Sequence, residues 1–99
     1  MPIQALWHDD QCTIAISGRF DFNAHRDFHE VCERVKQNTK VIVDFNRATY
    51  VDSSALGMLL LLKDRVADVN QVRLTNCRGH ADQVLRIANF HKLFPYSSG

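Results

Sequence analysis

Residues 41–64 read VIVDFNRATYVDSSALGMLLLLKD, and this stretch decides the fold. Its first five residues, 41–45, are β-branched and aromatic apart from one aspartate, which is typical of a mostly buried strand. Residues 56–62 are rich in Leu and Met and contain no Pro, which favours a helix. Between the two lie residues 52–54, Asp-Ser-Ser, which are common N-cap types. The stretch therefore predicts a strand, a short loop and a helix that begins with hydroxyl side chains.

The predicted helix begins at two serines, Ser53 and Ser54. The first amide groups of a helix have no intrahelical acceptor, and the positive end of the helix dipole lies beside them. Such a site is suited to hold a phosphate group. A simpler interpretation is that the serines only cap the helix, which is worth about 1 kcal/mol. The residue pattern by itself favours capping.

The rest of the chain alternates strands and helices. Residues 3–7 and 12–17 alternate in polarity and are joined by four polar residues, which predicts an antiparallel hairpin. Apolar positions at i, i+3, i+4 and i+7 then predict an amphipathic helix over residues 23–37, capped by Asp21 or Asn23. The remaining predictions are a central helix from Ser53 to about Asp68, a strand over residues 71–75, a helix over residues 81–89 and a chain end near Tyr96 that closes the core, with a short final strand as one option.

This order of elements predicts an α/β fold. We expect one domain over residues 1–99, because ninety-nine residues suffice for a single core. The N-terminal hairpin is antiparallel, and right-handed crossovers would make the later strands parallel. The predicted architecture is a mixed sheet of four to five strands packed with three or more helices.

The composition limits the classes of partner. Twelve Lys and Arg against eleven Asp and Glu give a net charge of +1, which offers no electrostatic case for nucleic acid or an anionic membrane surface. The apolar run at 56–62 is too short to span a bilayer, and no export leader precedes it, so a cytoplasmic monomer is expected. Cys12, Cys32 and Cys77 show no Cys-x-x-Cys spacing and are expected to be reduced and either in the core or half-buried.

The central helix carries more apolar surface than one packing face needs. Leu56, Leu59 and Leu60 lie roughly along one stripe, while Met58 and Leu61 extend the apolar character around the helix. One interpretation is a helix wedged between the sheet and a neighbouring helix. The other is a partner-docking face beside the serines, to which Met58 contributes.

Residues 51–57, Val-Asp-Ser-Ser-Ala-Leu-Gly, resemble the signature of the STAS domain family, specifically that of the stand-alone bacterial anti-sigma factor antagonists. The family pattern there is an aspartate, a phosphorylatable serine, Ser or Thr, a small residue, Leu and Gly, with Ala55 here where Gly is more usual. Residues 18–21, Gly-Arg-Phe-Asp, resemble the family's Gly-x-hydrophobic-Asp after the second strand. The order of elements agrees over nearly the whole chain.

The resemblance implies a partner-switching regulator in signal transduction and transcription, which is not an enzyme and needs no cofactor or metal. In the family, the unphosphorylated antagonist binds an anti-sigma factor that is also a serine kinase of the GHKL type. Phosphorylation releases the antagonist, and a PP2C-type phosphatase resets it. The phosphorylated residue corresponds to Ser53, with Ser54 as a secondary acceptor, so the resemblance favours phosphorylation over capping alone. The expected partner-binding residues are Asp21, Asp52, Ser53, Ser54, Ala55 and Met58, and for Asp21 a capping role stays equally open.

Other functions rest on fewer residues. His25 and His29 are four apart on a predicted helix and could share a metal, but the sequence positions no third ligand. The other histidines, His8, His80 and His91, are expected to be isolated and exposed. No Gly-x-Ser-x-Gly elbow or glycine-rich phosphate loop occurs, which argues against nucleophilic catalysis and nucleotide hydrolysis. The main alternative is a STAS subunit of a lipid or anion transport complex that is not switched by phosphorylation.

Overall fold

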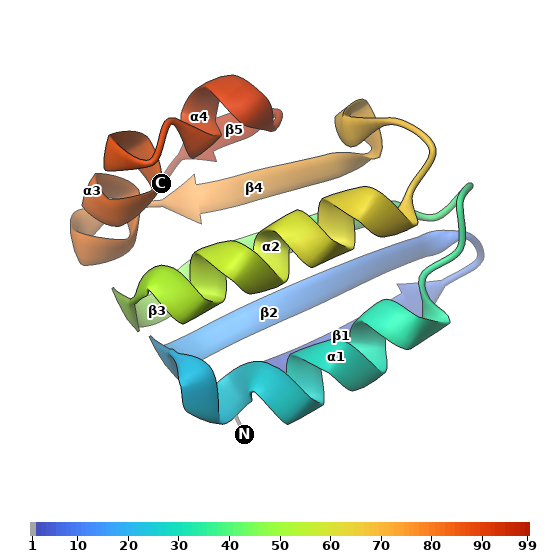
Figure 1. Cartoon of the computed structure of the whole chain (residues 1–99), viewed down its shortest axis with the longest axis horizontal. Coiled ribbons are helices and arrows are strands. Elements are labelled where there is room, and N and C mark those ends of the chain that lie inside the picture. Colours follow the sequence, from blue (N-terminus) through green and yellow to red (C-terminus); the bar gives the residue numbers. More distant parts are fainter. Residues whose placement is uncertain (1) are drawn as a thin grey trace.

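The computed structural model describes residues 2–99 and contains a five-stranded mixed sheet (Figure 1). The strands have the same order in space as in the sequence, β1-β2-β3-β4-β5. β1 pairs antiparallel with β2, and the other neighbours are parallel, as predicted. The strands are β1 (Ile3–His8), β2 (Gln11–Phe20), β3 (Lys40–Val51), β4 (Val72–Cys77) and β5 (Tyr96–Ser98), and the helices are η1 (Phe22–Ala24), α1 (His25–Arg34), α2 (Ser53–Arg65), η2 (Val69–Gln71), α3 (Gly79–Ile87) and α4 (Phe90–Leu93).

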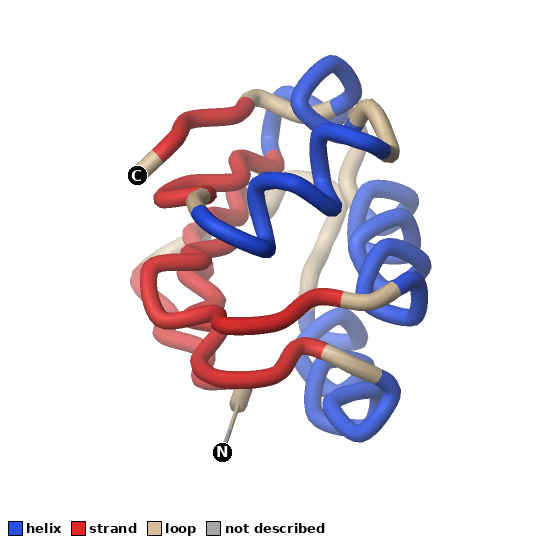
Figure 2. Tube along the Cα trace, turned by 90° about the vertical axis from the view of Figure 1, so that its left-hand side faces the viewer, coloured by secondary structure: helices blue, strands red, loops and turns tan. Residues whose placement is uncertain are grey.

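The core lies between the sheet and a layer formed by α1 and α2, which run side by side (Figures 1 and 2). Alternate residues of each strand face these helices, because side chains along a strand point to opposite faces. On β2 this confirms the predicted apolar face. The buried residues on β2 and β3 are Cys12, Ile14, Ile16, Phe20, Val41, Val43, Phe45 and Val51.

Two strands are longer than predicted. β3 continues to Val51 rather than ending at residue 45, and β2 continues to Phe20 rather than ending at residue 17. The register between them shifts twice, between Ala15 and Ser17 and again after Gly18. Gly18 has a φ of +70°, a left-handed conformation that favours glycine. Because these irregularities interrupt the alternation of side chains, the sequence pattern of a strand is lost where the pairing continues.

Two helices, α1 and α2, are shorter than predicted, whereas α3 (Gly79–Ile87) has the predicted length but begins and ends two residues earlier. α1 begins at His25 because its expected first turn is the separate 3₁₀ helix η1, and its chain becomes extended at Val35. α2 ends at Arg65 rather than near residue 68. None of the helices within residues 2–99 has the length and apolarity needed to cross a membrane.

α2 buries one part of its apolar surface and exposes another. Ala55, Leu59 and Leu62 are buried in the core, whereas Leu60 and Leu61 are exposed. The helix packs against the sheet and α1, as the first interpretation predicts, yet these two neighbours do not cover it completely.

An aromatic cluster joins the first half of the fold. The Phe20 ring lies 5.4 Å from that of Phe28 and 6.2 Å from that of Phe45, measured between ring centroids. These residues belong to β2, α1 and β3, and all are buried. Phe20 is also the last residue of β2, so the cluster fixes the position at which that strand ends.

The C-terminal strand is held by a polar network. The Tyr96 hydroxyl donates to Asp82 Oδ1 at 2.6 Å, and Arg86 Nε donates to both carboxylate oxygens of Asp82 at 2.9 and 3.1 Å. These contacts, the Tyr96 hydrogen bond first, lower the pKa of Asp82. Arg86 also donates to the Ser98 hydroxyl at 3.1 Å. The network therefore ties β5, the optional final strand of the sequence prediction, to α3.

The three cysteines are buried and free, as predicted. Burial raises the pKa of the thiols of Cys12, Cys32 and Cys77 to about 11. A thiol whose pKa is raised in the folded state stabilises the fold fully at pH values below its unfolded-state pKa, which is near 9. This stabilisation is lost as the pH rises through the folded-state pKa.

We therefore expect the domain to unfold more easily at pH 10 than at pH 8, by about 1 kcal/mol for each thiol. Urea denaturation at both pH values measures the loss. The matched variant Cys32→Ala retains every other titrating group. Its unfolding free energy should therefore fall between pH 8 and pH 10 by less than that of the wild-type protein, the difference being the contribution of one thiol. An identical dependence in both proteins would contradict the assignment.

Candidate functional site

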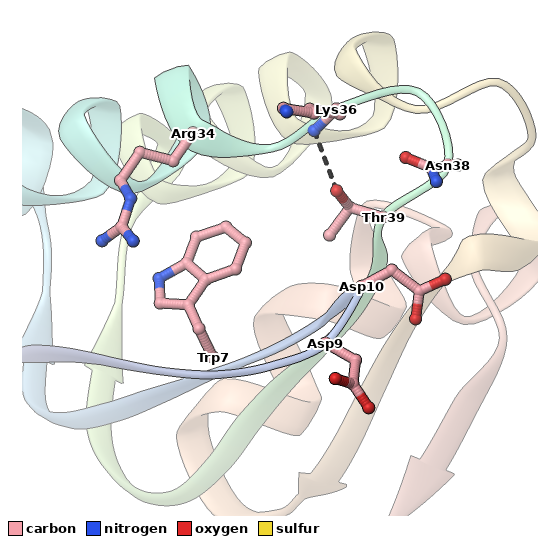
Figure 3. A pocket seen from close by; sticks show the side chains of 7 residues that line it. All are labelled: Trp7, Asp9, Asp10, Arg34, Lys36, Asn38 and Thr39. Atoms are coloured by element: carbon pink, nitrogen blue, oxygen red, sulfur yellow. Dashed lines mark hydrogen bonds between the residues drawn. The ribbon is translucent and has the colours of Figure 1, made fainter.

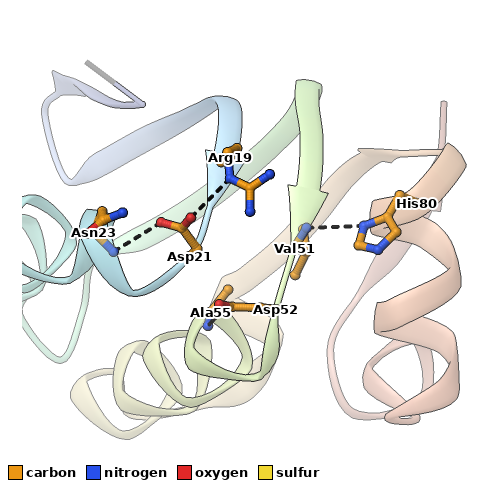
Figure 4. A network of polar contacts seen from close by, with 7 residues as sticks. All are labelled: Arg19, Asp21, Asn23, Val51, Asp52, Ala55 and His80. Carbon is orange, nitrogen blue, oxygen red and sulfur yellow. Dashed lines mark hydrogen bonds and ion pairs between the residues drawn. The ribbon is translucent and has the colours of Figure 1, made fainter.

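The ends of β2 and β3 meet the beginning of α2 at one edge of the sheet (Figure 4). Phe20 pairs with Val51, and the Asp52 amide donates to the Phe20 carbonyl oxygen at 3.4 Å. Asp21 and Asp52 are the residues that directly follow these two paired positions. The structure thus brings together the two acidic residues that the sequence analysis placed beside Ser53.

Asp52, and not a serine, caps α2. Its Oδ1 accepts a hydrogen bond from the Ala55 amide at 3.2 Å, while Ser53 and Ser54 occupy the first two helical positions. The interpretation of the serines as caps is therefore wrong. Ser53 is exposed, and its hydroxyl makes no hydrogen bond to any of residues 2–99. The first amides of α2 lie next to it without intrahelical acceptors.

Asp21 has a structural role as well as its place in the site. Its Oδ1 accepts from the Asn23 amide at 3.0 Å, which caps η1, and its Oδ2 accepts from Arg19 Nε at 3.2 Å. Only 14% of the Asp21 side chain is exposed. The capping interpretation is confirmed for η1, the turn that precedes α1, and a partner contact by Asp21 stays a prediction.

A stack of side chains beside this site was not predicted from the sequence. The Arg19 guanidinium lies 4.0 Å from the centroid of the Tyr50 ring, and the His80 ring stacks on Tyr50 at 4.9 Å. His80 Nδ1 also accepts a hydrogen bond from the Val51 amide at 3.2 Å (Figure 4). His80 is exposed but not isolated, because it joins α3 to the end of β3.

The remaining predicted partner-binding residues differ in accessibility. Ser54 is half-buried, and Ala55 and Met58 are buried, with Met58 only 3% exposed. In the free domain Ala55 and Met58 therefore present almost no surface to a partner, and their contribution to binding stays a prediction. Met58 forms part of the wall of a hollow between α1 and α2.

His25 and His29 lie at this hollow, with their rings parallel and 6.1 Å apart. His29 Nε2 is 3.6 Å from Glu33 on the same helix. Within residues 2–99, no group of three or more His, Cys, Asp or Glu side chains is placed to hold a metal ion.

His91, expected to be exposed, is instead half-buried, and its ring meets that of Tyr96 edge-on at 6.1 Å.

Another hollow, of about 490 Å³, lies at the opposite end of the sheet (Figure 3). Trp7 forms one wall, and the Arg34 guanidinium lies 4.7 Å from its ring centroid. The mouth of this hollow carries a basic side chain, Lys36, on one side and two acidic side chains, Asp9 and Asp10, on the other. This hollow is remote from Ser53, because it adjoins the first residues of β3 rather than the last.

Replacing Asp52 with Ala is expected to lower the free energy of unfolding by about 1 kcal/mol, because the Ala55 amide loses its side-chain acceptor. Asp52→Asn keeps an acceptor oxygen at the same position and serves as the matched control, with most of the stability retained. Urea denaturation followed by circular dichroism measures both. Equal losses in the two variants would show that charge, rather than the cap, accounts for the effect of Asp52.

Sequence comparison identifies relatives over the whole described fold. A family model described as "Mlab, STAS domain" matches residues 3–95. The chain is 48% identical over 101 residues to a STAS-domain containing protein of Pseudomonas aeruginosa (strain UCBPP-PA14), and the match covers 98% of this chain and 100% of that protein.

Solved structures share the fold at low sequence identity. An anti-sigma factor antagonist from Mycobacterium paratuberculosis superposes with a TM-score of 0.81 at 13% identity, over 98% of this chain and 85% of that one. A sulfate transporter family protein from Wolinella succinogenes superposes with a TM-score of 0.71 at 13% identity, over 93% of this chain and 80% of that one. At these identities the likeness shows the fold alone.

Proposed function

The chain belongs to the STAS domain family, and from this premise we propose that it is a partner-switching regulator controlled by phosphorylation of Ser53. The observation that carries the proposal is the free Ser53 hydroxyl at the start of α2, left available because Asp52 supplies the cap. In its unphosphorylated form the domain binds an anti-sigma factor or an equivalent regulatory partner. It acts as a cytoplasmic binding module of one domain, monomeric when free, and not as an enzyme.

The start of α2 can accept a phosphate without damage to the fold. A phosphoserine carries about −1.5 to −2 charges at neutral pH. The unpaired first amides and the positive end of the helix dipole stabilise a negative charge there. Ser53 is exposed, so its phosphate would not need to enter the core. The modification is therefore expected to act on binding and to leave folding almost unchanged.

The same phosphate disturbs a surface in contact with a partner. Asp52 is adjacent to it in sequence, and Asp21 follows the strand position paired with Val51. The guanidinium of Arg19 is not free to neutralise the phosphate charge, because it already pairs with Asp21. Like charges that are crowded at an interface cost several kcal/mol by order of magnitude. A tight complex would thus become a weak one.

Intact-mass spectrometry with site mapping, on protein isolated from its native cells with and without phosphatase treatment, tests the switch. We expect a phosphate on Ser53, with Ser54 as the secondary acceptor. Ser53→Ala then serves as bait, since it keeps the binding state, and is expected to retain a serine kinase of the GHKL type. The phosphatase that resets the wild-type protein is expected to be of the PP2C type.

A transport role is the second candidate, because a sulfate transporter family protein shares this fold. In that case the domain would be a subunit of a lipid or anion transport complex without a phosphate on Ser53. Stable co-purification with a transporter ATPase, together with an unmodified Ser53 under several growth conditions, would support this candidate against the switch.

A further inference from the structure

The hollow between α1 and α2, here called the α1–α2 groove, has a volume of about 200 Å³. Its walls include His25, His29 and Cys32 on α1 and Met58, Leu61 and Asp64 on α2. Met58 and Cys32 are buried at the groove, whereas Leu61 is 52% exposed. A largely apolar groove between two adjacent helices is the kind of surface that an amphipathic segment binds.

The α1–α2 groove is too small for a typical small-molecule ligand, since such pockets measure about 300–1,000 Å³. A single apolar side chain inserted into a pocket is instead the usual anchor of a protein interface. Aromatic rings extend the apolar wall beyond the groove. Phe22, 69% exposed, stacks on His25 with ring centroids 5.8 Å apart, and His25 stacks on His29.

The exposed side of α2 leads from the groove to the candidate phosphorylation site. Ser53, Gly57 and Leu61 are spaced by four residues, so they lie along one face of the helix, and all three are exposed. At 1.5 Å per residue, Ser53 and Leu61 are about 12 Å apart along the axis. Gly57 has no side chain between them, and nothing lies within 4 Å of the position a Cβ would take. A partner segment can therefore approach α2 closely over its first two turns.

The charges at the rim indicate the chemistry of that segment. Arg65 at the groove donates to the backbone carbonyl oxygens of Glu33 and Val35, at 2.9 and 3.4 Å, and Glu33 faces His29. The carboxylate of Asp64 is exposed and has neither a hydrogen bond nor an ion pair with residues 2–99. The groove lining thus holds two carboxylates, Glu33 and Asp64, and one guanidinium, Arg65, so with neutral histidines its formal charge is −1, and its complement is a Lys or Arg.

We propose that the α1–α2 groove docks an amphipathic helical segment of the protein partner, which inserts an apolar side chain beside Leu61 and places a Lys or Arg near Asp64. The inference rests on the proposed function, because it names where that partner binds. A partner seated in the groove passes over Gly57 toward Ser53, so a phosphate on Ser53 would lie next to the bound segment.

Photo-crosslinking tests the location of the partner. Benzoylphenylalanine at position 61 of the full chain, in native cells, is compared with the same residue at position 6. Leu6 is 69% exposed on β1 and points away from the helices, because Ile3, Ala5 and Trp7 face them. We expect a crosslink from position 61 alone, mapped by mass spectrometry to an amphipathic segment with Lys or Arg within one helical turn of the crosslinked residue.

Charge substitutions test the energetics on the same complex. Leu61→Glu is expected to weaken binding of the partner captured by Ser53→Ala by at least tenfold, and Asp64→Lys by several-fold, while Leu6→Glu changes it less than twofold. The proposal is overturned if position 61 crosslinks nothing, a second copy of this chain or a segment without basic residues, or if Leu61→Glu leaves the affinity unchanged.

The two proposals fail in different ways. If Ser53 is never phosphorylated but the mapped crosslink is found, the switch is wrong and the docking surface stands. If phosphorylation of Ser53 releases a partner that is indifferent to Leu61→Glu, the switch stands and the docking surface is wrong.

Discussion

Replacing Ser53 with Asp is expected to weaken binding of the captured partner by at least tenfold. The new carboxylate adjoins Asp52 and lies at the strand ends where Asp21 is fixed, so like charges gather on the contact surface. A genuine phosphoserine should have a larger effect, of several kcal/mol, because it carries up to two charges. Isothermal titration of the partner with Ser53→Ala, Ser53→Asp and phosphorylated protein measures the series.

The fold should survive this substitution. An acidic residue in the first turn of a helix is favourable by about 0.3–1 kcal/mol, so the urea midpoint should stay the same or rise slightly. Asn38→Asp, an exposed substitution in the loop before β3, adds the same charge at the far end of that strand and should leave affinity unchanged. If circular dichroism showed the Ser53→Asp variant to be unfolded, this would contradict the expectation that the charge acts on binding.

Replacing Phe20 with Ala is expected to cost about 3–5 kcal/mol of unfolding free energy. Phe20 is fully buried and packs against Phe28 and Phe45, so its removal leaves a cavity where β2, α1 and β3 meet. A domain of this size has only about 5–15 kcal/mol in total. Urea denaturation should therefore show a much lower midpoint, and the site residues that follow Phe20 and Val51 should lose their fixed positions.

The chain offers a matched control two residues away. Phe22 is 69% exposed, so Phe22→Ala should change the unfolding free energy by less than about 0.5 kcal/mol. The pair compares the same chemical truncation in a buried and an exposed environment. Equal losses from the two variants would contradict the assigned core.

The sequence predicted those elements whose side chains keep a regular period. Cys12, Ile14 and Ile16 alternate in polarity with their neighbours, and they form the buried face of β2. The end of β3 was missed because Asn46 and Thr49 fall at the two register shifts between β2 and β3, so alternation no longer reports burial there. The length of α1 was overestimated because apolar spacing cannot separate an α-helix from a preceding 3₁₀ turn, and because Val35 is buried in an extended conformation after the helix ends.

At the candidate site, too, some features were predicted from the sequence and others were not. The sequence placed Asp21, Asp52 and Ser53 together through the family resemblance of two motifs, residues 18–21 and residues 51–57. It left the cap open among residues 52–54, because Asp and Ser are both good caps, and only the observed start of α2 assigns the cap to Asp52. The stack of Arg19, Tyr50 and His80 depends on the β2–β3 register and on where α3 begins. Its one local signal is that Arg19 and Tyr50 each lie two residues before an aspartate.

The strand order has a consequence for how the chain folds during synthesis. Each strand pairs with the strand made just before it, so no strand has to be inserted between two that already pair. As the chain emerges from the ribosome, the β1–β2 hairpin can form first and offer an edge to β3, which in turn offers one to β4. Short separations between paired strands also reduce the entropy lost in closing each loop and favour rapid folding. We therefore expect assembly from the N-terminus, with β5 docking last.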